Sequence, residues 1–256
     1  VLLSQYMGLF HPLLHWNGAS GDNFMALVSN NILAIFVSIL ADIIVEQMYH
    51  IFHGKHLLII TNQPDTWDTF TPDFIFKNPK PKQIQEVLKL SKKATQKLKI
   101  ALVGEPDAIF RMLLGKFNRI IAAGGLVFNE HNELLLIKRL GKWDLPKGKL
   151  EPEEEMEQCA IREVMEETNV QNLTIRHSLP DTFHTYYRDH QWIIKQTHWY
   201  AMFCKKQQNL KPQTEEDIEA VEWFPFESLD IKKLKTYPAI RYIIKSYQKP
   251  TPNMGL

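Results

Sequence analysis

A run of acidic residues between positions 148 and 170 constrains this chain more than any other feature. Within it, Glu166 and Glu167 follow Glu163 by three and four residues, which is the spacing of one helical turn. A helix brings such positions to one side, so the pattern predicts a helix whose three carboxylates share a face. Hard divalent cations such as Mg²⁺ or Mn²⁺ choose oxygen ligands and relieve the repulsion between clustered negative charges. The run therefore predicts a metal-binding helix.

The same helix is expected to dock on a core. Ile161, Val164 and Met165 form an apolar stripe at helical spacing, and such a stripe packs against other elements. We expect the helix to anchor itself through these three residues and to present the carboxylates on its opposite side. Other acids around the run, such as Glu151 and Glu157, are expected on a solvated surface.

The spacing of the charged residues resembles the box of the Nudix hydrolases, written G-x5-E-x7-R-E-U-x-E-E-x-G-U, where U is a bulky apolar residue. The matching residues here are Gly148, Glu154, Arg162-Glu163-Val164, Glu166-Glu167 and Val170. Asn169 replaces the last glycine of the box. That position follows the helix, where a left-handed residue is wanted, and asparagine is the usual substitute for glycine there.

The resemblance implies roles for the box residues. Glu166 and Glu167 would be the principal metal ligands, and Glu163 a further ligand or the group that orients the attacking water. The backbone carbonyl of Lys147 would join the coordination. Arg162 would pair with Glu154 and hold the loop before the helix against it, a supporting role that is typically worth roughly 10–100-fold in activity.

The general base varies among the Nudix hydrolases and can lie outside the box. Glu215, Glu216 and Asp217 precede a predicted strand that begins at Ile218. We take these acids as the candidates for an outside carboxylate.

The implied reaction is hydrolysis of a nucleoside diphosphate linked to another group, or of a related polyphosphate. Cleavage of a phosphoanhydride by water needs cations on the phosphate oxygens and a base or metal that activates the water. The loop 143–149 (WDLPKGK) resembles the variant of diadenosine polyphosphate hydrolases and other MutT-like members. The expected substrate-binding residues precede or lie in this loop, with Trp143 as a candidate for base stacking: Lys138, Arg139, Lys142, Trp143, Lys147 and Lys149.

The order of apolar segments predicts an α/β fold with three parts. Residues 118–256 would form the Nudix α/β/α sandwich with a mixed sheet. Residues 48–117 would form a small α+β domain in front of it, and residues 1–47 an apolar segment of uncertain status. Strands are expected over 49–52, 56–61, 99–103, 120–128, 134–139, 173–178, 182–187, 192–204 and 218–224, helices over 82–97, 105–116 and 237–247, and loops over 64–81 and 141–149.

Composition bears on partners and location. The formal net charge is +1, so no global field indicates nucleic acid or membrane as a partner. The two cysteines, Cys159 and Cys204, fit a reducing compartment and packing roles, and we expect a cytoplasmic protein. Residues 24–45 are apolar but interrupted by polar side chains, which leaves a membrane tether open as the less favoured alternative.

Two functional classes stay open at this stage. The first is an enzyme that uses Mg²⁺ or Mn²⁺ to hydrolyse a nucleotide-type substrate, working as a single chain or as a homodimer. The alternative is a non-catalytic Nudix-fold sensor or regulator, in which residues 48–117 carry the output. The retention of every glutamate of the box favours the enzyme.

Overall fold

Two neighbouring strands near one edge of the sheet bury side chains on both of their faces. These are β5 (Asn118–Phe128) and β6 (Glu133–Arg139) in the computed structural model, which describes residues 48–63, 71–206 and 209–248. Alternate residues of a strand point to opposite faces, so both strands contribute side chains to two separate cores. One core, beside α5 (Met156–Thr168), takes Ala123, Val127, Leu135 and Ile137, and the other, beside α6 (Pro238–Gln248), takes Leu126, Phe128, Leu134 and Leu136.

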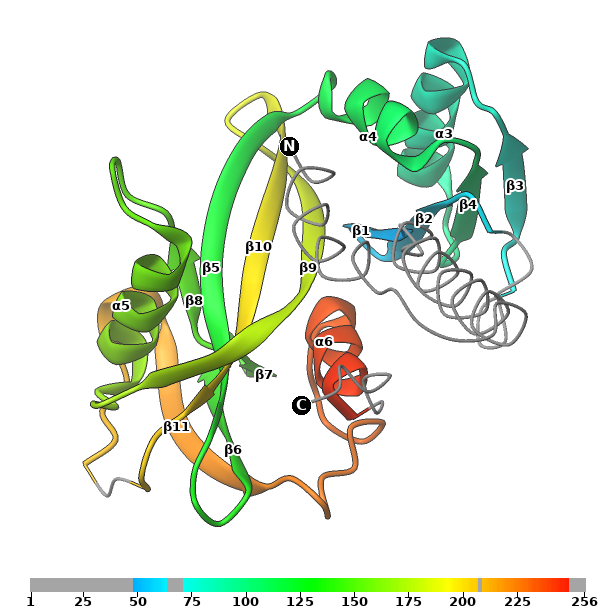
Figure 1. Ribbon diagram of the computed structural model, residues 1–256. Coiled ribbons are helices and arrows are strands. Elements are labelled where there is room, and N and C mark those ends of the chain that lie inside the picture. The colour runs from blue at the N-terminus through cyan, green and yellow to red at the C-terminus, as the bar shows by residue number, and fades with distance from the viewer. Residues whose placement is uncertain (1–47, 64–70, 207–208, 249–256) are drawn as a thin grey trace, which may run out of the picture. The chain divides into compact units, whose positions relative to one another are not determined.

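The sheet thus lies between helices, with α5 and α6 on opposite sides of it (Figure 1). Strands β10 (Gln191–Phe203) and β5 pair in parallel, whereas β9 (Thr174–Arg188) and β10 pair antiparallel. Strand β11 (Ile218–Pro225) closes one edge against β6. The expected sandwich of helices around a mixed sheet is confirmed.

The segment before β5 continues this sheet. Strands β1 (Met48–His53) and β2 (His56–Thr61) lie where strands were expected and form a hairpin, with Gly54 in the left-handed region at the turn. Strand β2 pairs in parallel with β4 (Lys99–Val103), which pairs in parallel with the edge strand β3 (Phe74–Lys77). Helices α3 (Pro81–Lys93) and α4 (Pro106–Leu114) complete the segment, as the sequence predicted.

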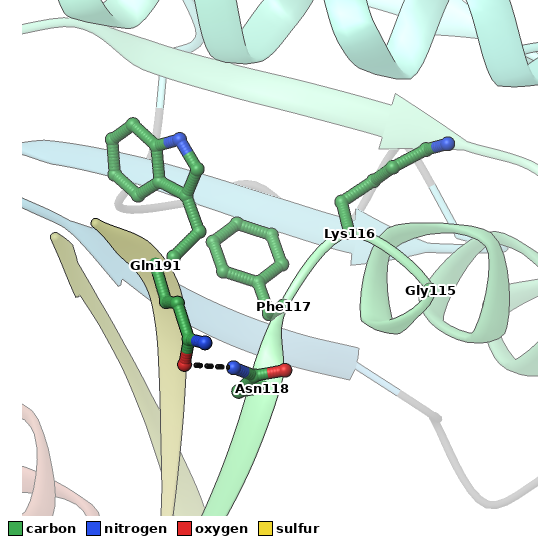
Figure 2. A pocket seen from close by; sticks show the side chains of 6 residues that line it. Gly115, Lys116, Phe117, Asn118 and Gln191 are labelled. Carbon is green, nitrogen blue, oxygen red and sulfur yellow. Dashed lines mark hydrogen bonds between the residues drawn. The ribbon is translucent and has the colours of Figure 1, made fainter. Parts of the chain in front are cut away.

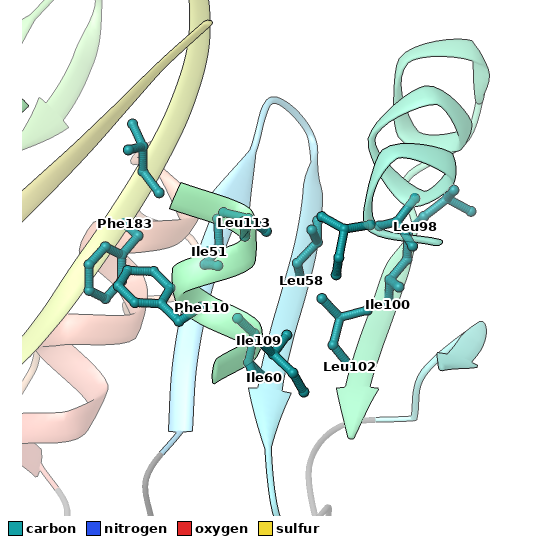
Figure 3. Packing of buried hydrophobic residues seen from close by; sticks show 13 residues of the cluster. Ile51, Leu58, Ile60, Leu98, Ile100, Leu102, Ile109, Phe110, Leu113 and Phe183 are labelled. Atoms are coloured by element: carbon teal, nitrogen blue, oxygen red, sulfur yellow. The ribbon is translucent and has the colours of Figure 1, made fainter. Parts of the chain in front are cut away.

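A third core joins this segment to the rest of the sheet (Figure 3). Ile51, Leu58 and Ile100 pack there with Phe183 of β9 and with the aromatic ring of Phe110. Strand β1 also pairs in parallel with β9, so that the sheet order is β11-β6-β5-β10-β9-β1-β2-β4-β3. The division into domains at residue 118 stays a prediction, because backbone pairing runs without a break across it.

Three local expectations were wrong. Residues 74–77, expected in a loop, form β3, while 64–70 of that loop lie outside the described residues. The loop 141–149 contains two short strands, β7 (Lys142–Asp144) against β6 and β8 (Lys147–Lys149) against β5. The two strands expected over 173–187 are one, because a register shift opposite Pro180 absorbs the residue that cannot donate to the ladder.

The predicted apolar segment 1–47, including the tether at 24–45, lies outside the described residues. Among the residues that are described, no helix is long and apolar enough to cross a membrane.

Candidate active site

Helix α5 begins and ends as its sequence predicts. The side chain of Gln158 accepts a hydrogen bond from the backbone N–H of Glu155, the residue that caps the helix. At the other end, Asn169 adopts a left-handed conformation (φ 62°), and its N–H donates to the carbonyl of Met165 at 2.8 Å. Asparagine tolerates this conformation better than other residues with a side chain. The replacement of glycine at the end of the box is therefore compatible with the helix.

The face that α5 buries is only in part the one expected. Val164 is fully buried, and the half-buried Ile161 packs against the same core. Met165 is half-buried, does not belong to that core, and borders a pocket together with Ile161. Glu163 and Glu167 also lie on the inner side, 7% and 0% exposed. The expected apolar stripe is thus confirmed for Ile161 and Val164 and wrong for Met165. The expectation that the carboxylates lie away from the core was wrong for Glu163 and Glu167, and the backbone N–H of Lys147 in β8 holds the Glu167 carboxylate on the inner side.

Glu167 is the most deeply buried carboxylate of the site. Its Oε2 accepts a hydrogen bond from the backbone N–H of Lys147 at 2.9 Å. Its Oε1 is buried and has no hydrogen-bond partner among the described residues. Burial disfavours the charged form and raises the pKa of Glu167 to about 7, against the opposing effect of the Lys147 charge and N–H. One carboxylate oxygen is therefore held in place while the other is left without a partner.

Arg162 connects the carboxylates to one another. It donates two hydrogen bonds to Glu154, at 2.7 and 2.8 Å, which confirms the predicted contact between these residues. The same guanidinium donates to Glu163 at 2.9 Å and to Glu166 at 3.1 Å. Its hydrogen bonds hold the pKa of Glu154 down at about 2. Paired, planar bonds of this kind fix orientation as well as charge.

Gly148 is required by the close approach of β8 to the helix. A Cβ atom at this position would lie 1.8 Å from Oε2 of Glu163. Any side chain would therefore displace that carboxylate. Gly148 therefore lets the Glu163 carboxylate lie directly against the backbone of β8.

The carboxylates fit the oxygen ligands of a hard divalent cation, although they do not stand as a complete ligand set. In the described part of the chain, no three or more His, Cys, Asp and Glu side chains are gathered as a metal cluster. Glu163 and Glu166 each accept a bond from Arg162, whereas Glu167 keeps a buried Oε1 without a partner. A buried, unpartnered carboxylate oxygen is costly unless a cation or donor meets it. Glu167 with Glu163 would hold such a cation.

The outside acids and the basic residues are distributed around this centre. Glu216 lies close enough to Glu163 to raise the pKa of that carboxyl, after the larger effect of burial, and it pairs with Arg139 at 3.6 Å. Its neighbours Glu215 and Asp217 lie in and directly after the short 3₁₀ helix η2 (Thr214–Glu216). Their part in the chemistry stays a prediction.

The predicted substrate-binding side chains do not form one group. Lys138 pairs with Glu219 at 3.6 Å, and Lys142 lies 4.4 Å from the centre of the Tyr237 ring. Trp143 packs edge-on against an aromatic ring of β11, and Lys149 is exposed. The Lys147 ammonium donates to Asp144 at 2.8 Å. Although burial alone would lower the pKa of Lys147, Asp144 and Glu167 raise it overall. Their roles in substrate binding stay predictions.

One basic residue near the site escaped the sequence analysis. Lys195 lies in the middle of β10, and burial followed by the charge of Lys147 lowers its pKa to about 8. Its neighbour across the strand pair is His184. A lysine inside the apolar strand 192–203 was the available signal.

A second pocket lies at the start of β5, away from the predicted site residues. It is lined by Lys116, Phe117, Asn118 and the first two residues of β10, and the amide of Asn118 donates to Gln191 (Figure 2). It brings together no charged pair or nucleophile.

Comparisons with known proteins show which family the chain belongs to. The family model described as NUDIX domain matches residues 118–247. The chain belongs to the NUDIX domain family. The matched residues begin with β5 and end in α6, so they enclose all of the box and both cores beside it.

Individual relatives of the NUDIX domain are distant. The chain is 31% identical over 136 residues to the m7GpppN-mRNA hydrolase of Saccharomyces cerevisiae, covering 50% of this chain and 13% of that protein. It is 47% identical over 45 residues to a putative 8-oxo-dGTP diphosphatase of Bacillus subtilis, covering 17% and 30% of the two. The crystal structure of a MutT protein from Methanosarcina mazei shares 21% identity and a TM-score of 0.42, covering 52% of this chain and 95% of that one. The chain thus spans less than a third of the two curated relatives.

Proposed function

We propose that this chain is a divalent-metal-dependent Nudix pyrophosphohydrolase that cleaves a phosphoanhydride bond of a nucleotide-type substrate by attack of water on phosphorus. The observation that carries the proposal is the state of Glu167: one oxygen is fixed by the Lys147 N–H and the other is buried without a partner. Family membership supports hydrolysis of phosphoanhydrides in general. The metal requirement follows from the carboxylates.

The residues divide the work between binding and orientation. Glu167 and Glu163 would hold Mg²⁺ or Mn²⁺, with Glu166 joining when Arg162 releases it. Such a cation, when bound, neutralises phosphate oxygens and lowers the pKa of coordinated water. Arg162 orients the carboxylates through Glu154, and Glu216, which lies near Glu163, is the candidate to accept the proton of the attacking water.

The substrate is expected to be a nucleotide with a phosphoanhydride. The names of two relatives, an m7GpppN-mRNA hydrolase and a putative 8-oxo-dGTP diphosphatase, both refer to nucleotides. No observation favours the alternative of a non-catalytic sensor, since every box glutamate is retained. Residues 48–117 are proposed as a support for the catalytic part, because β1 extends its sheet.

The test is a hydrolysis screen with matched variants. Wild type, Glu167→Gln and Glu157→Gln would be assayed with Mg²⁺ and Mn²⁺ on dinucleoside polyphosphates, nucleotide sugars, ADP-ribose, oxidised nucleotides and capped RNA. Glu157 is an exposed acid of the same helix and serves as the control. Because loss of a residue that merely supports a ligand costs about 10–100-fold, loss of the ligand Glu167 should cost about 100-fold or more. A Glu167→Gln variant as active as the control would refute the proposal.

A further inference from the structure

Lys195 occupies a defined place in the sheet beside the proposed active site. Its partners in the ladders are His184 of β9 on one side and Ile120 of β5 on the other. Alternation along β10 places it on the same face as Trp199, which belongs to the core beside α6. Lys195 is half-buried as a residue, and its strand neighbour His184 is exposed.

Within the described part of the chain, the ammonium of Lys195 lacks a counter-ion. Among the described residues it forms no ion pair and no hydrogen bond, whereas Lys147 pairs with Asp144 and Arg139 pairs with Glu216. Burial, together with the charges of Lys147 and Arg139, lowers the pKa of Lys195, and only Asp144 and Glu167 oppose this. Unpaired charges in such surroundings are costly. A ligand anion would relieve this cost.

Strand β9 places a second side chain, His184, beside Lys195 on the same face of the sheet. Burial, Lys195 and Lys147 lower the pKa of His184, in that order, so its ring is a neutral hydrogen-bonding group near neutral pH. Strand β1 pairs with β9 at this point, and the buried ring of His53 hydrogen-bonds the Thr185 hydroxyl. Side chains that bind ligands are placed most accurately by rigid, supported strands.

We propose that Lys195 and His184 form an anion subsite that binds a non-scissile phosphate of the substrate, so that the preferred substrates carry three or more phosphates in a row. This inference rests on the proposed function. In that reaction the carboxylates would hold a cation beside the phosphates at the bond that breaks. The additional cation at Lys195 would then face the next phosphate of the chain.

A binding experiment tests the subsite without turnover. Inorganic tripolyphosphate would be titrated calorimetrically, with a chelator present, into wild type, Lys195→Met, Lys195→Arg and the control Lys89→Met, in which an exposed lysine of α3 is changed in the same way. Lys195→Met should weaken binding by about 10-fold or more, as expected for a hydrogen bond between charged groups. Lys195→Arg and the control should stay within about 3-fold of wild type. Unchanged affinity in Lys195→Met, or no binding by the wild type, would overturn the inference.

Steady-state kinetics separate this inference from the proposed function. For a dinucleoside tetraphosphate, Lys195→Met should raise KM by about 10-fold with little change in kcat, while kcat/KM for ADP-ribose, with two phosphates, changes by less than about 3-fold. If both substrates are affected equally while Glu167→Gln is inactive, the subsite is wrong and the function stands. If no nucleotide is hydrolysed but tripolyphosphate binding depends on Lys195, the function is wrong and the subsite stands.

Discussion

Replacing Glu167 by glutamine should stabilise the metal-free protein at alkaline pH. The buried carboxyl has a pKa of about 7, against an ordinary value of 4.5. Below pH 4.5 the carboxyl is neutral in the folded and the unfolded chain alike, so it makes no difference there. Between these two values the folded protein retains a proton that the unfolded chain has lost, and stability falls as pH rises. Above about pH 7 the full cost of a buried charge is present.

The size of the effect follows from the same two pKa values. A difference of one pKa unit corresponds to about 1.4 kcal/mol, so the ionised carboxylate costs about 3 kcal/mol of folding free energy relative to the neutral acid. Glutamine copies the neutral acid in shape, and its oxygen can accept the Lys147 N–H in place of Oε2. Its amide donors have no buried partner at Oε1, which offsets about 1–2 kcal/mol of the gain. A net gain of about 1–2 kcal/mol is expected at pH 8.

The assay is urea unfolding of wild type and Glu167→Gln at pH 5 and pH 8 with a chelator present. Glu157→Gln, a change at an exposed acid of the same helix, is the control for the altered net charge. The gap between wild type and Glu167→Gln should open as pH rises from 5 to 8, and adding Mg²⁺ at pH 8 should stabilise only the wild type. A gap that is the same at both pH values, or that favours the wild type without metal at pH 8, would show that the carboxylate is not strained by burial.

Three further substitutions follow from the contacts around the helix. Arg162→Ala leaves Glu154 and Glu163 without their shared partner and should cost about 2–4 kcal/mol in urea unfolding; a loss below 1 kcal/mol would show that these bonds contribute little. Gly148→Ala forces the Glu163 carboxylate aside, so Mn²⁺ binding followed by electron paramagnetic resonance should weaken by about 10-fold or more, with the circular dichroism spectrum unchanged. Asn169→Ala should lower stability by about 1–2 kcal/mol in thermal unfolding because alanine avoids the left-handed conformation, whereas Asn169→Gly should change it by much less, and equal losses would contradict the role of the cap.

Local rules were enough to predict the helix and its ends. The spacing of the acids determines which turns they occupy, and the left-handed Asn169 follows from what a helix end requires. The contact between Arg162 and Glu154 was predictable because the Nudix box carries it. The hairpin of β1 and β2 was predictable from its turn at Gly54.

The burial of the carboxylates and the position of Lys195 could not be predicted in this way. Glu167 is buried because the backbone of Lys147, twenty residues earlier, donates to it, and periodicity does not report such a contact. Lys195 is placed beside the site by pairing with strands distant in sequence. Strand β3 was missed because its apolar run is only three residues long, Phe74 to Phe76, and lies within a stretch rich in proline, aspartate and threonine.

The parallel pairing of β1 with β9 has a practical consequence for any shortened form of the protein. Ile51, Phe52 and His53 cover the backbone of residues 183–185. A chain that begins at Asn118 would leave the N–H and C=O groups of β9 open along a strand edge, beside the uncovered side chain of Phe183. Open, apolar strand edges recruit other chains. We therefore expect the family-matched segment alone to self-associate. In the longer chain, β1 covers this strand edge.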